Sequence, residues 1–364
     1  MKRMLCIVGG LNQGGAETFL MKLLRNFDKN EYMLDFCVMS SEIGTYESEI
    51  KDLGGKIYHI VPKSQNPIKC FCEIRKIVRE HGYESVIRVN EHSLSVIDLI
   101  AAKLGGAKKL VMRSSNADSG SKKSKYLHKL FSFLPRWIPN VNIAPSTKAA
   151  EYTFGKKNVK KGKVAFLQNG LSVEDFTFNE SIRQNLRKEL NLEDKFVVGH
   201  IGRFSAQKNH KFLIDVFKNI AEKKENACLL LVGGNGELSE QTKAYVTKLG
   251  LEGNVTFLGN RSDVNKLLSV FDMLVFPSIY EGMPNVVIEA QAAGLPCLIS
   301  DTITPDADIT GLIKYFSLEK SASEWADEAI AHSTRFERRS YKEDFTTAGY
   351  DIEAVVEKFI NLVF

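Results

Sequence analysis

The fold of this chain is constrained most by a repeated order of apolar strand, glycine turn and helix. The run Met4–Val8 is continuously apolar, a glycine-rich loop spans 9–15, and residues 16–27 have helical periodicity. In the carboxyl half, the apolar run Cys228–Val232 leads into Gly233 and the same order recurs. This alternation predicts an α/β fold in which helices cover both faces of a parallel sheet. At 364 residues with 44% hydrophobic content, the chain is long enough for two such domains.

Two carboxylates on either side of a predicted helix start form the first candidate site. In residues 276–300, FPSIYEGMPNVVIEAQAAGLPCLIS, a strand ends, a turn follows and a helix begins at Asn285. Glu281 would then lie on the loop and Glu289 one turn into the helix. Helix-start N–H groups suit a phosphate, and carboxylates accept hydrogen bonds from sugar hydroxyls. We interpret the pair as a site for a sugar attached to a phosphate. Two ordinary surface acids are the alternative, but the apolar neighbours of Glu289 make an unpartnered acid costly.

A second candidate site follows the strand that ends at Gly202. Arg203 and Lys208 extend from the next loop, and Asn209 is placed to cap a helix that starts at His210. Two cations beside a helix start suit a diphosphate. A solvated Arg and Lys are the alternative when this segment is taken alone.

Together these motifs resemble a known family. The E-x7-E spacing of Glu281 and Glu289 and the G-R-x4-K-N element at 202–209 resemble the donor site of retaining GT-B glycosyltransferases, family 4, the glycosyl transferases group 1. The resemblance implies two Rossmann-like doubly wound domains facing each other across a cleft. It also implies transfer of a hexose from a nucleoside-diphosphate sugar, UDP-linked by preference and GDP-mannose next, to a saccharide or lipid-linked saccharide. Retention by front-face attack, in cell-surface polysaccharide synthesis, is part of the same expectation.

The resemblance assigns roles to individual residues. The implied catalytic residues are Arg203, Lys208 and Glu281: the cations stabilise the departing diphosphate, and Glu281 binds hydroxyls of the donor sugar. No metal or cofactor is expected, because cationic side chains and a helix end take that place. The implied nucleotide-sugar-binding residues are Gly14, Gly15, Gly202, Gly233, Arg261, Met283, Asn285, Val286 and Glu289.

The resemblance also implies domain boundaries. Residues 168–176 resemble the N-G-[IV]-D segment that leads into the second domain, which places the linker near Phe176–Glu180. An acceptor-side domain is therefore expected at 1–176, a nucleotide-sugar-binding domain at 177–348, and a C-terminal helix at 349–364 that crosses back to the first domain.

The amino domain departs from the family pattern where many relatives carry histidines. This chain has Val-Asn-Glu-His at 89–92 and Arg-Ser-Ser-Asn at 113–116, so the candidates for the acceptor side are Asn90, His92, Arg113 and Asn116. Two alternatives stay open: a sugar-nucleotide 2-epimerase of the same architecture, for which we find no clear set of proton-transfer groups, and a non-catalytic sugar-nucleotide-binding partner of a transferase. A dinucleotide oxidoreductase is disfavoured because the loop at 9–15 lacks G-x-G-x-x-G.

Charge and hydropathy predict where the protein works. The net charge is only +5, but lysines concentrate at 121–138 and 156–163. The first segment mixes them with aromatic and apolar residues, which favours contact with anionic lipid headgroups, although an ordinary amphipathic helix has the same pattern. No basic module predicts a nucleic-acid partner. With no signal peptide and no apolar run of 18 residues, we expect a location in the cytoplasm or at the inner face of the cell membrane. Six cysteines without framework spacing predict reduced thiols, without a metal site or a disulfide.

Overall fold

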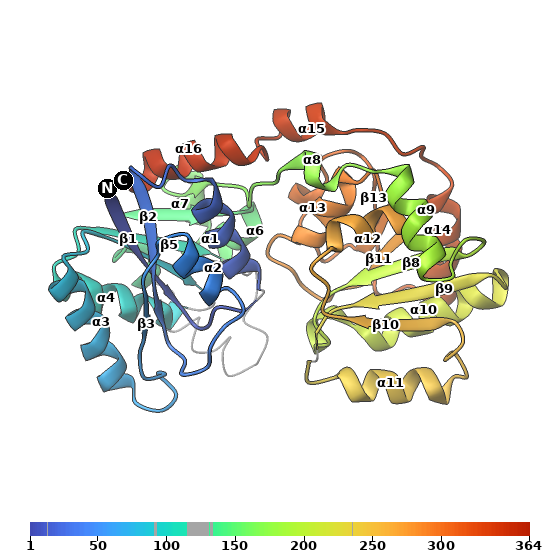
Figure 1. Cartoon of the computed structure of the whole chain (residues 1–364), viewed down its shortest axis with the longest axis horizontal. Coiled ribbons are helices and arrows are strands. Elements are labelled where there is room, and N and C mark those ends of the chain that lie inside the picture. The colour runs from blue at the N-terminus through green and yellow to red at the C-terminus, as the bar shows by residue number, and fades with distance from the viewer. Residues whose placement is uncertain (13, 91–92, 115–130, 132–133, 235) are drawn as a thin grey trace. The chain divides into compact units, whose positions relative to one another are not determined.

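The computed structural model describes residues 1–12, 14–90, 93–114, 131, 134–234 and 236–364, and the chain divides into two compact units (Figure 1). The first unit holds Met1–Gly170 and Gly349–Phe364, and the second holds Leu171–Ala348. The chain thus leaves the first unit at Gly170, earlier than the expected boundary after 176. The expected linker at 176–180 instead lies inside the second unit.

The first unit is built on a seven-stranded sheet in the order β3-β2-β1-β4-β5-β6-β7, with every neighbouring pair parallel. Its strands are β1 (Lys2–Val8), β2 (Tyr32–Val38), β3 (Ile57–His59), β4 (Ser85–Asn90), β5 (Lys109–Ser114), β6 (Val141–Ala144) and β7 (Ala165–Phe166). Its described helices are α1 (Gly15–Asn26), α2 (Glu47–Asp52), α3 (Pro67–His81), α4 (Val96–Gly105), α6 (Thr147–Phe154), α7 (Lys156–Lys160) and α16 (Ile352–Val363), with 3-10 turns η1 (Ser93–Ser95) and η2 (Leu134–Arg136).

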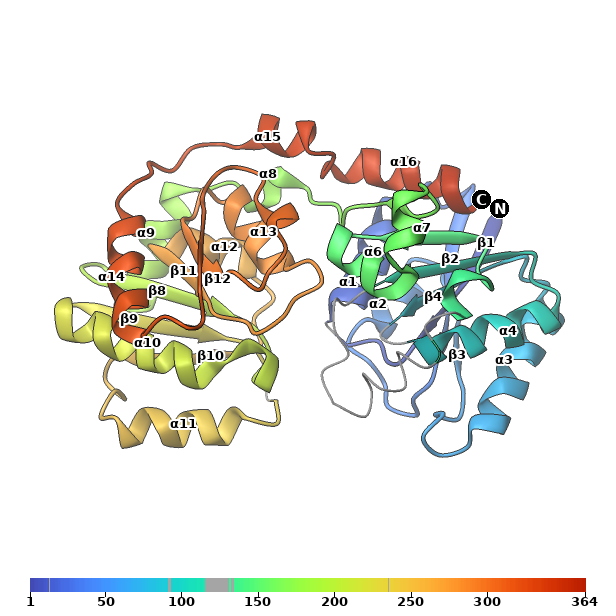
Figure 2. The same ribbon diagram turned by 180° about the vertical axis from the view of Figure 1, so that it is seen from behind.

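Strand β1 shows why helices cover both faces of this sheet. Successive side chains of a strand point to opposite faces, so Met4, Cys6 and Val8 join the apolar cluster of α1 and α16. Leu5 and Ile7 join the cluster of α3 and α4, which lie side by side in Figure 2. A strand buried on both faces has a continuous apolar sequence, as predicted for Met4–Val8.

The last helix, α16, belongs to the first unit although it ends the chain. The ring of Phe359 lies 6.1 Å from that of Phe19 and 6.2 Å from that of Phe27, both on or beside α1. Asp351 caps α16 by accepting hydrogen bonds from the amides of Glu353 and Ala354. Aromatic packing and a capped start together fix this helix on the first sheet.

The second unit contains a six-stranded parallel sheet in the order β10-β9-β8-β11-β12-β13. Its strands are β8 (Phe196–Ile201), β9 (Ala227–Val232), β10 (Val255–Gly259), β11 (Met273–Phe276), β12 (Cys297–Ser300) and β13 (Ile313–Phe316). Its described helices are α8 (Val173–Phe176), α9 (Glu180–Glu189), α10 (His210–Lys223), α11 (Ser239–Lys248), α12 (Val264–Val270), α13 (Asn285–Ala292), α14 (Ala322–Ser333) and α15 (Lys342–Thr347), with 3-10 turns η3 (Ala206–Lys208) and η4 (Pro305–Ala307). The predicted α/β class is confirmed in both units.

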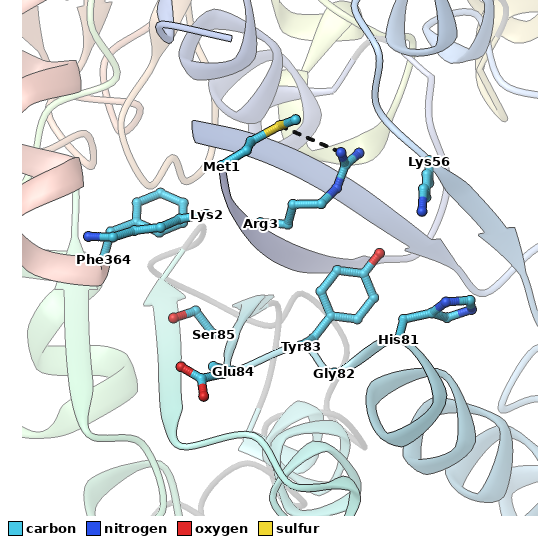
Figure 3. A pocket seen from close by; sticks show the side chains of 10 residues that line it. All are labelled: Met1, Lys2, Arg3, Lys56, His81, Gly82, Tyr83, Glu84, Ser85 and Phe364. Atoms are coloured by element: carbon cyan, nitrogen blue, oxygen red, sulfur yellow. Dashed lines mark hydrogen bonds between the residues drawn. The ribbon is translucent and has the colours of Figure 1, made fainter. Parts of the chain in front are cut away.

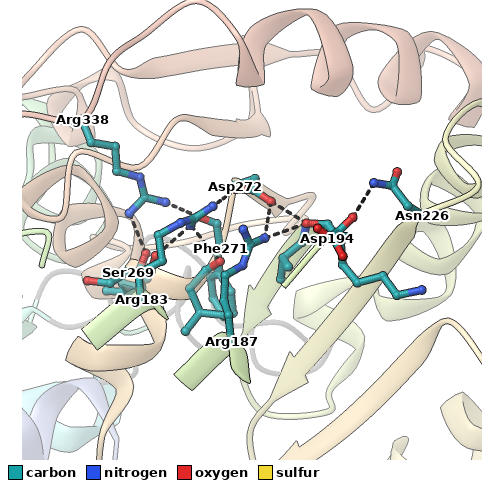
Figure 4. Close-up of polar contacts among 12 residues, drawn as sticks. Arg183, Arg187, Asp194, Asn226, Ser269, Phe271, Asp272 and Arg338 are labelled. Carbon is teal, nitrogen blue, oxygen red and sulfur yellow. Dashed lines mark hydrogen bonds and ion pairs between the residues drawn. The ribbon is translucent and has the colours of Figure 1, made fainter. Parts of the chain in front are cut away.

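Three arginines hold the turn between α12 and β11 (Figure 4). Arg183 and Arg187 on α9 bind the carboxylate of Asp272, at 2.5 and 2.7 Å, and Asp272 also accepts a hydrogen bond from the amide of Val197 on β8. Arg338 donates to the carbonyl oxygens of Leu268 and Phe271. Burial, and then the charge of Arg183, lower the pKa of Arg338 to about 9. This network fixes the amino end of β11, the strand that leads to the candidate site.

Among the described residues, no helix combines the length and the apolar character that a membrane crossing requires.

Candidate functional site

The loop after β11 and the start of α13 place the two predicted carboxylates. Helix α13 begins at Asn285, as predicted, with Glu281 on the loop before it and Glu289 on the helix. Glu281 is 8% exposed and Glu289 is half-buried. The residue before α13 is Pro284, whose side chain makes no capping hydrogen bond. Both acids therefore lie near the start of the helix that follows the central strand β11.

The loop with Glu281 is attached to the loop after β8. The amide of Ile279 donates to the carbonyl of Gln207 at 2.8 Å, and the Gln207 side chain donates to the carbonyl of Tyr280 at 2.9 Å. The G-R-x4-K-N element and the E-x7-E element, far apart in the sequence, are therefore one structural site.

An ion pair between Lys208 and Glu281 lies at the centre of this site. Lys208 Nζ is 2.7 Å from Glu281 Oε1, and the two side chains are 17% and 9% exposed. The same ammonium group lies 4.4 Å from the ring centroid of Phe276, the last residue of β11. Sequence reasoning placed both residues in the site but did not foresee that they bind each other.

The two predicted cations have different environments, and the predicted cap is wrong. Arg203 is exposed, and its guanidinium makes no hydrogen bond or ion pair within the part of the chain that the structure describes. Asn209 precedes α10 with φ 56° and ψ 45°, a left-handed conformation, and its side chain makes no capping bond. Asn tolerates this conformation better than most residues, which explains the position without a cap.

The strand-end glycines allow a close backbone approach. A Cβ atom on Gly233 would lie 2.2 Å from the carbonyl oxygen of Gly202, and Gly233 has φ +156°. A Cβ atom on Gly202 would lie 3.1 Å from Cε of Lys208. Packing within the protein is therefore sufficient to require glycine at Gly233, whatever ligand approaches.

Four more of the predicted donor-site residues lie in the second unit. Arg261 forms a two-pronged ion pair with Asp263, at 2.8 and 2.6 Å, and this bond holds the pKa of Asp263 below its usual value. Met283 is buried, whereas Asn285 and Val286 at the start of α13 are half-buried.

Two neighbours of the ion pair were missed by sequence reasoning. His200 on β8 and His210 at the start of α10 are 1% and 2% exposed, and their rings lie next to each other. The available signal was a histidine inside the apolar strand run, where a buried ring is expected.

The first unit holds the remaining predicted residues. Gly14 precedes α1 and Gly15 begins it. Arg113, on β5, is 2% exposed, hydrogen-bonds to Asn169 and lies 3.7 Å from the ring centroid of Phe19; burial lowers its pKa to about 9. Asn90 is the last residue of β4, whereas His92 and Asn116 lie outside the described residues, as does most of the segment 121–138.

A cavity of about 420 Å³ lies elsewhere in the first unit, at the amino end of β1 (Figure 3). Its lining includes Lys2, Arg3 and Tyr83 and none of the predicted site residues.

Comparison with known proteins shows which family the chain belongs to. Residues 182–329 match the family described as glycosyl transferases group 1. EpsF of Bacillus subtilis, provisionally named a glycosyltransferase, is 32% identical over 99% of this chain and 96% of its own. A UDP-Gal:α-D-GlcNAc-diphosphoundecaprenol α-1,3-galactosyltransferase of Escherichia coli is 27% identical over 64% of this chain and 62% of its own. The crystal structure of Anabaena HepE with UDP-glucose superposes with a TM-score of 0.75 at 18% identity, over 98% of this chain and 95% of that one. The chain belongs to the glycosyl transferases group 1 family and has the GT-B fold.

Proposed function

We propose that this glycosyltransferase moves a hexose from a UDP-sugar to a lipid-linked saccharide, with retention of anomeric configuration. The observation that carries the proposal is the Lys208–Glu281 pair beside the start of α13. The name of the E. coli relative, which states a UDP-galactose donor and a diphosphoundecaprenol-linked acceptor, supports this choice of substrates.

The donor side follows from charge. Departure of a nucleoside diphosphate develops negative charge on the leaving oxygen, and cations aimed at that oxygen lower the barrier. Lys208 and the exposed Arg203 supply positive charge, and the first amides of α13 supply a positive helix end. These groups take the part that a metal ion plays elsewhere, so we propose metal-independent transfer.

The carboxylates bind the sugars. We assign Glu289 to the ribose hydroxyls and Glu281 to the hydroxyls of the donor sugar, where it also stabilises positive charge on the sugar ring. Glu281 holds the ammonium of Lys208 at 2.7 Å, and a bound diphosphate shares this ammonium with Glu281.

A membrane surface fits a lipid-linked acceptor. Lys156, Lys157, Lys160, Lys161 and Lys163 are all exposed, and no residue of α7 is buried. Clustered lysines near anionic lipid contribute about 1 kcal/mol each. Co-sedimentation with phosphatidylglycerol vesicles should fall when these lysines become glutamines; equal binding by both proteins would contradict the membrane proposal.

The donor site is tested by calorimetry against a panel of UDP- and GDP-sugars, with Glu289→Ala and Arg203→Ala variants. A matched control is Lys211→Ala, an exposed cation on α10 that pairs with Asp215 at 3.3 Å and lies 4.9 Å from the ring centroid of Tyr245. We expect one UDP-sugar to bind and both site variants to lose roughly ten- to a hundredfold in affinity, with the control unchanged. The anomeric configuration of the product, read by NMR, then tests retention. Binding without turnover on any acceptor would favour a non-catalytic partner instead.

A further inference from the structure

Two buried histidines lie beside Lys208, and the proposed chemistry uses neither. The ring centroids of His200 and His210 are 4.9 Å apart, with the planes at 75°. The two rings come from different elements, β8 and α10, on either side of the loop that carries Lys208. Both rings therefore lie in the protein interior beneath the Lys208 side chain.

A phenylalanine ring packs against each of these two histidines. His200 stacks on Phe276, with centroids 5.5 Å apart, and the ring of Phe276 also contacts the ammonium of Lys208. His210 stacks on Phe204 at 4.5 Å. The order of contacts is therefore ammonium, Phe276, His200, His210 and Phe204.

The polar atoms of His200 point in two defined directions. Nδ1 is 3.0 Å from the carbonyl oxygen of Val275 and donates to it, so Nε2 of the neutral ring carries the lone pair. Nε2 is buried and has no hydrogen-bond partner among the described residues. A Cβ atom built on Gly202 would lie 3.3 Å from this Nε2 and 3.1 Å from Cε of Lys208. The lone pair of His200 and the stem of Lys208 thus converge on the same point.

Both rings are uncharged near neutral pH. Burial, and next the charge of Lys208, lower the pKa of His210 to about 4, and burial lowers the pKa of His200 well below its usual value. The charged groups near the pair are Lys208 and Glu281, which is bound to Lys208. The carbonyl of Val275 raises the pKa of His200, and that of Ser205 raises the pKa of His210, but burial outweighs both. A proton on either ring would place a second buried positive charge beside the ammonium.

We infer that His200 and His210 are positioning residues for Lys208: their packed rings hold its ammonium group at Glu281. The inference rests on the proposed function for its catalytic meaning, since a fixed ammonium group is what the donor diphosphate requires. Removing His200 opens space beside the Lys208 stem and removes the support under Phe276.

A double-mutant cycle tests this role. His200→Asn keeps an N–H that reaches toward the carbonyl of Val275 but lacks the ring, and Lys208→Met keeps the stem but lacks the charge. We expect His200→Asn to weaken UDP binding about tenfold, which is about 1.4 kcal/mol, and to leave uridine binding unchanged because uridine has no diphosphate. In the Lys208→Met background the same substitution should change UDP affinity less than about twofold. An equal loss in both backgrounds would overturn the inference.

The control is His332→Asn. His332 is 3% exposed in the same unit, and its Nε2 bonds to the carbonyl of Leu312 at 2.9 Å, so it is another buried histidine with one backbone partner. Its substitution should lower thermal stability without changing UDP affinity. If the wild-type protein binds no nucleoside diphosphate, the proposed function fails, and thermal unfolding midpoints of the same cycle decide the inference alone. Non-additive shifts would support positioning of Lys208, and additive shifts would overturn it.

Discussion

Substitution of Asp272 tests how much its ion pairs stabilise the second unit. Replacing it with Asn keeps the size of the side chain and removes the charge that binds Arg183 and Arg187. Breaking a buried ion pair from one side costs about 3–5 kcal/mol, because the remaining charge is left without compensation. Asp272 is 22% exposed and the arginines 18% and 11%, so water reduces the cost. We expect the free energy of unfolding of this unit to fall by about 2–4 kcal/mol.

The chain contains a suitable probe for this measurement. Trp325 is fully buried in the second unit, whereas Trp137 in the first is 81% exposed, so a fluorescence change on unfolding reports mainly the second unit. With an m-value of roughly 2 kcal/mol per M urea, the midpoint should shift by about 1–2 M. The matched control is Asp327→Asn, which breaks the exposed Lys223–Asp327 pair and should cost at most about 1 kcal/mol. Equal midpoints for the two variants would refute the reasoning.

Two further predictions concern backbone space and pH. Gly233→Ala should lower the urea midpoint and abolish nucleotide binding, because its methyl group would lie 2.2 Å from the carbonyl oxygen that follows β8, whereas Gly253→Ala, with open space around it, should change neither. The pKa of His59 is raised by its hydrogen bond to the carbonyl of Ser40 and then by Glu47. Protonated His59 therefore stabilises the folded protein below the pKa that this side chain has in the unfolded chain, and this stabilisation is lost as pH rises through its folded pKa. Thermal midpoints measured from pH 5.5 to 8 should therefore fall in the wild type more than in His59→Asn, and parallel curves would contradict this account.

The sequence pattern predicted the fold better than the contacts of the site. Strand periodicity and glycine turns located β11, the loop with Glu281 and the helix with Glu289, because these features depend on residues close together in the chain. The Lys208–Glu281 bond joins residues 73 positions apart, and no local pattern specifies which cation an acid will meet. The conformation of Asn209 was missed for a related reason. Its side chain suggested a cap, but the tight turn after η3 requires a left-handed residue there, which Asn supplies.

The place of α16 has a consequence for how the protein is made. Because the first unit contains both Met1–Gly170 and Gly349–Phe364, the second unit is inserted within it along the chain. The core of the first unit includes Phe359 and Val363 of α16. Every residue of the second unit is synthesised before them. We therefore expect the usual order, in which the amino-terminal part folds first, to be reversed: the second unit can finish its core while the first unit still lacks α16.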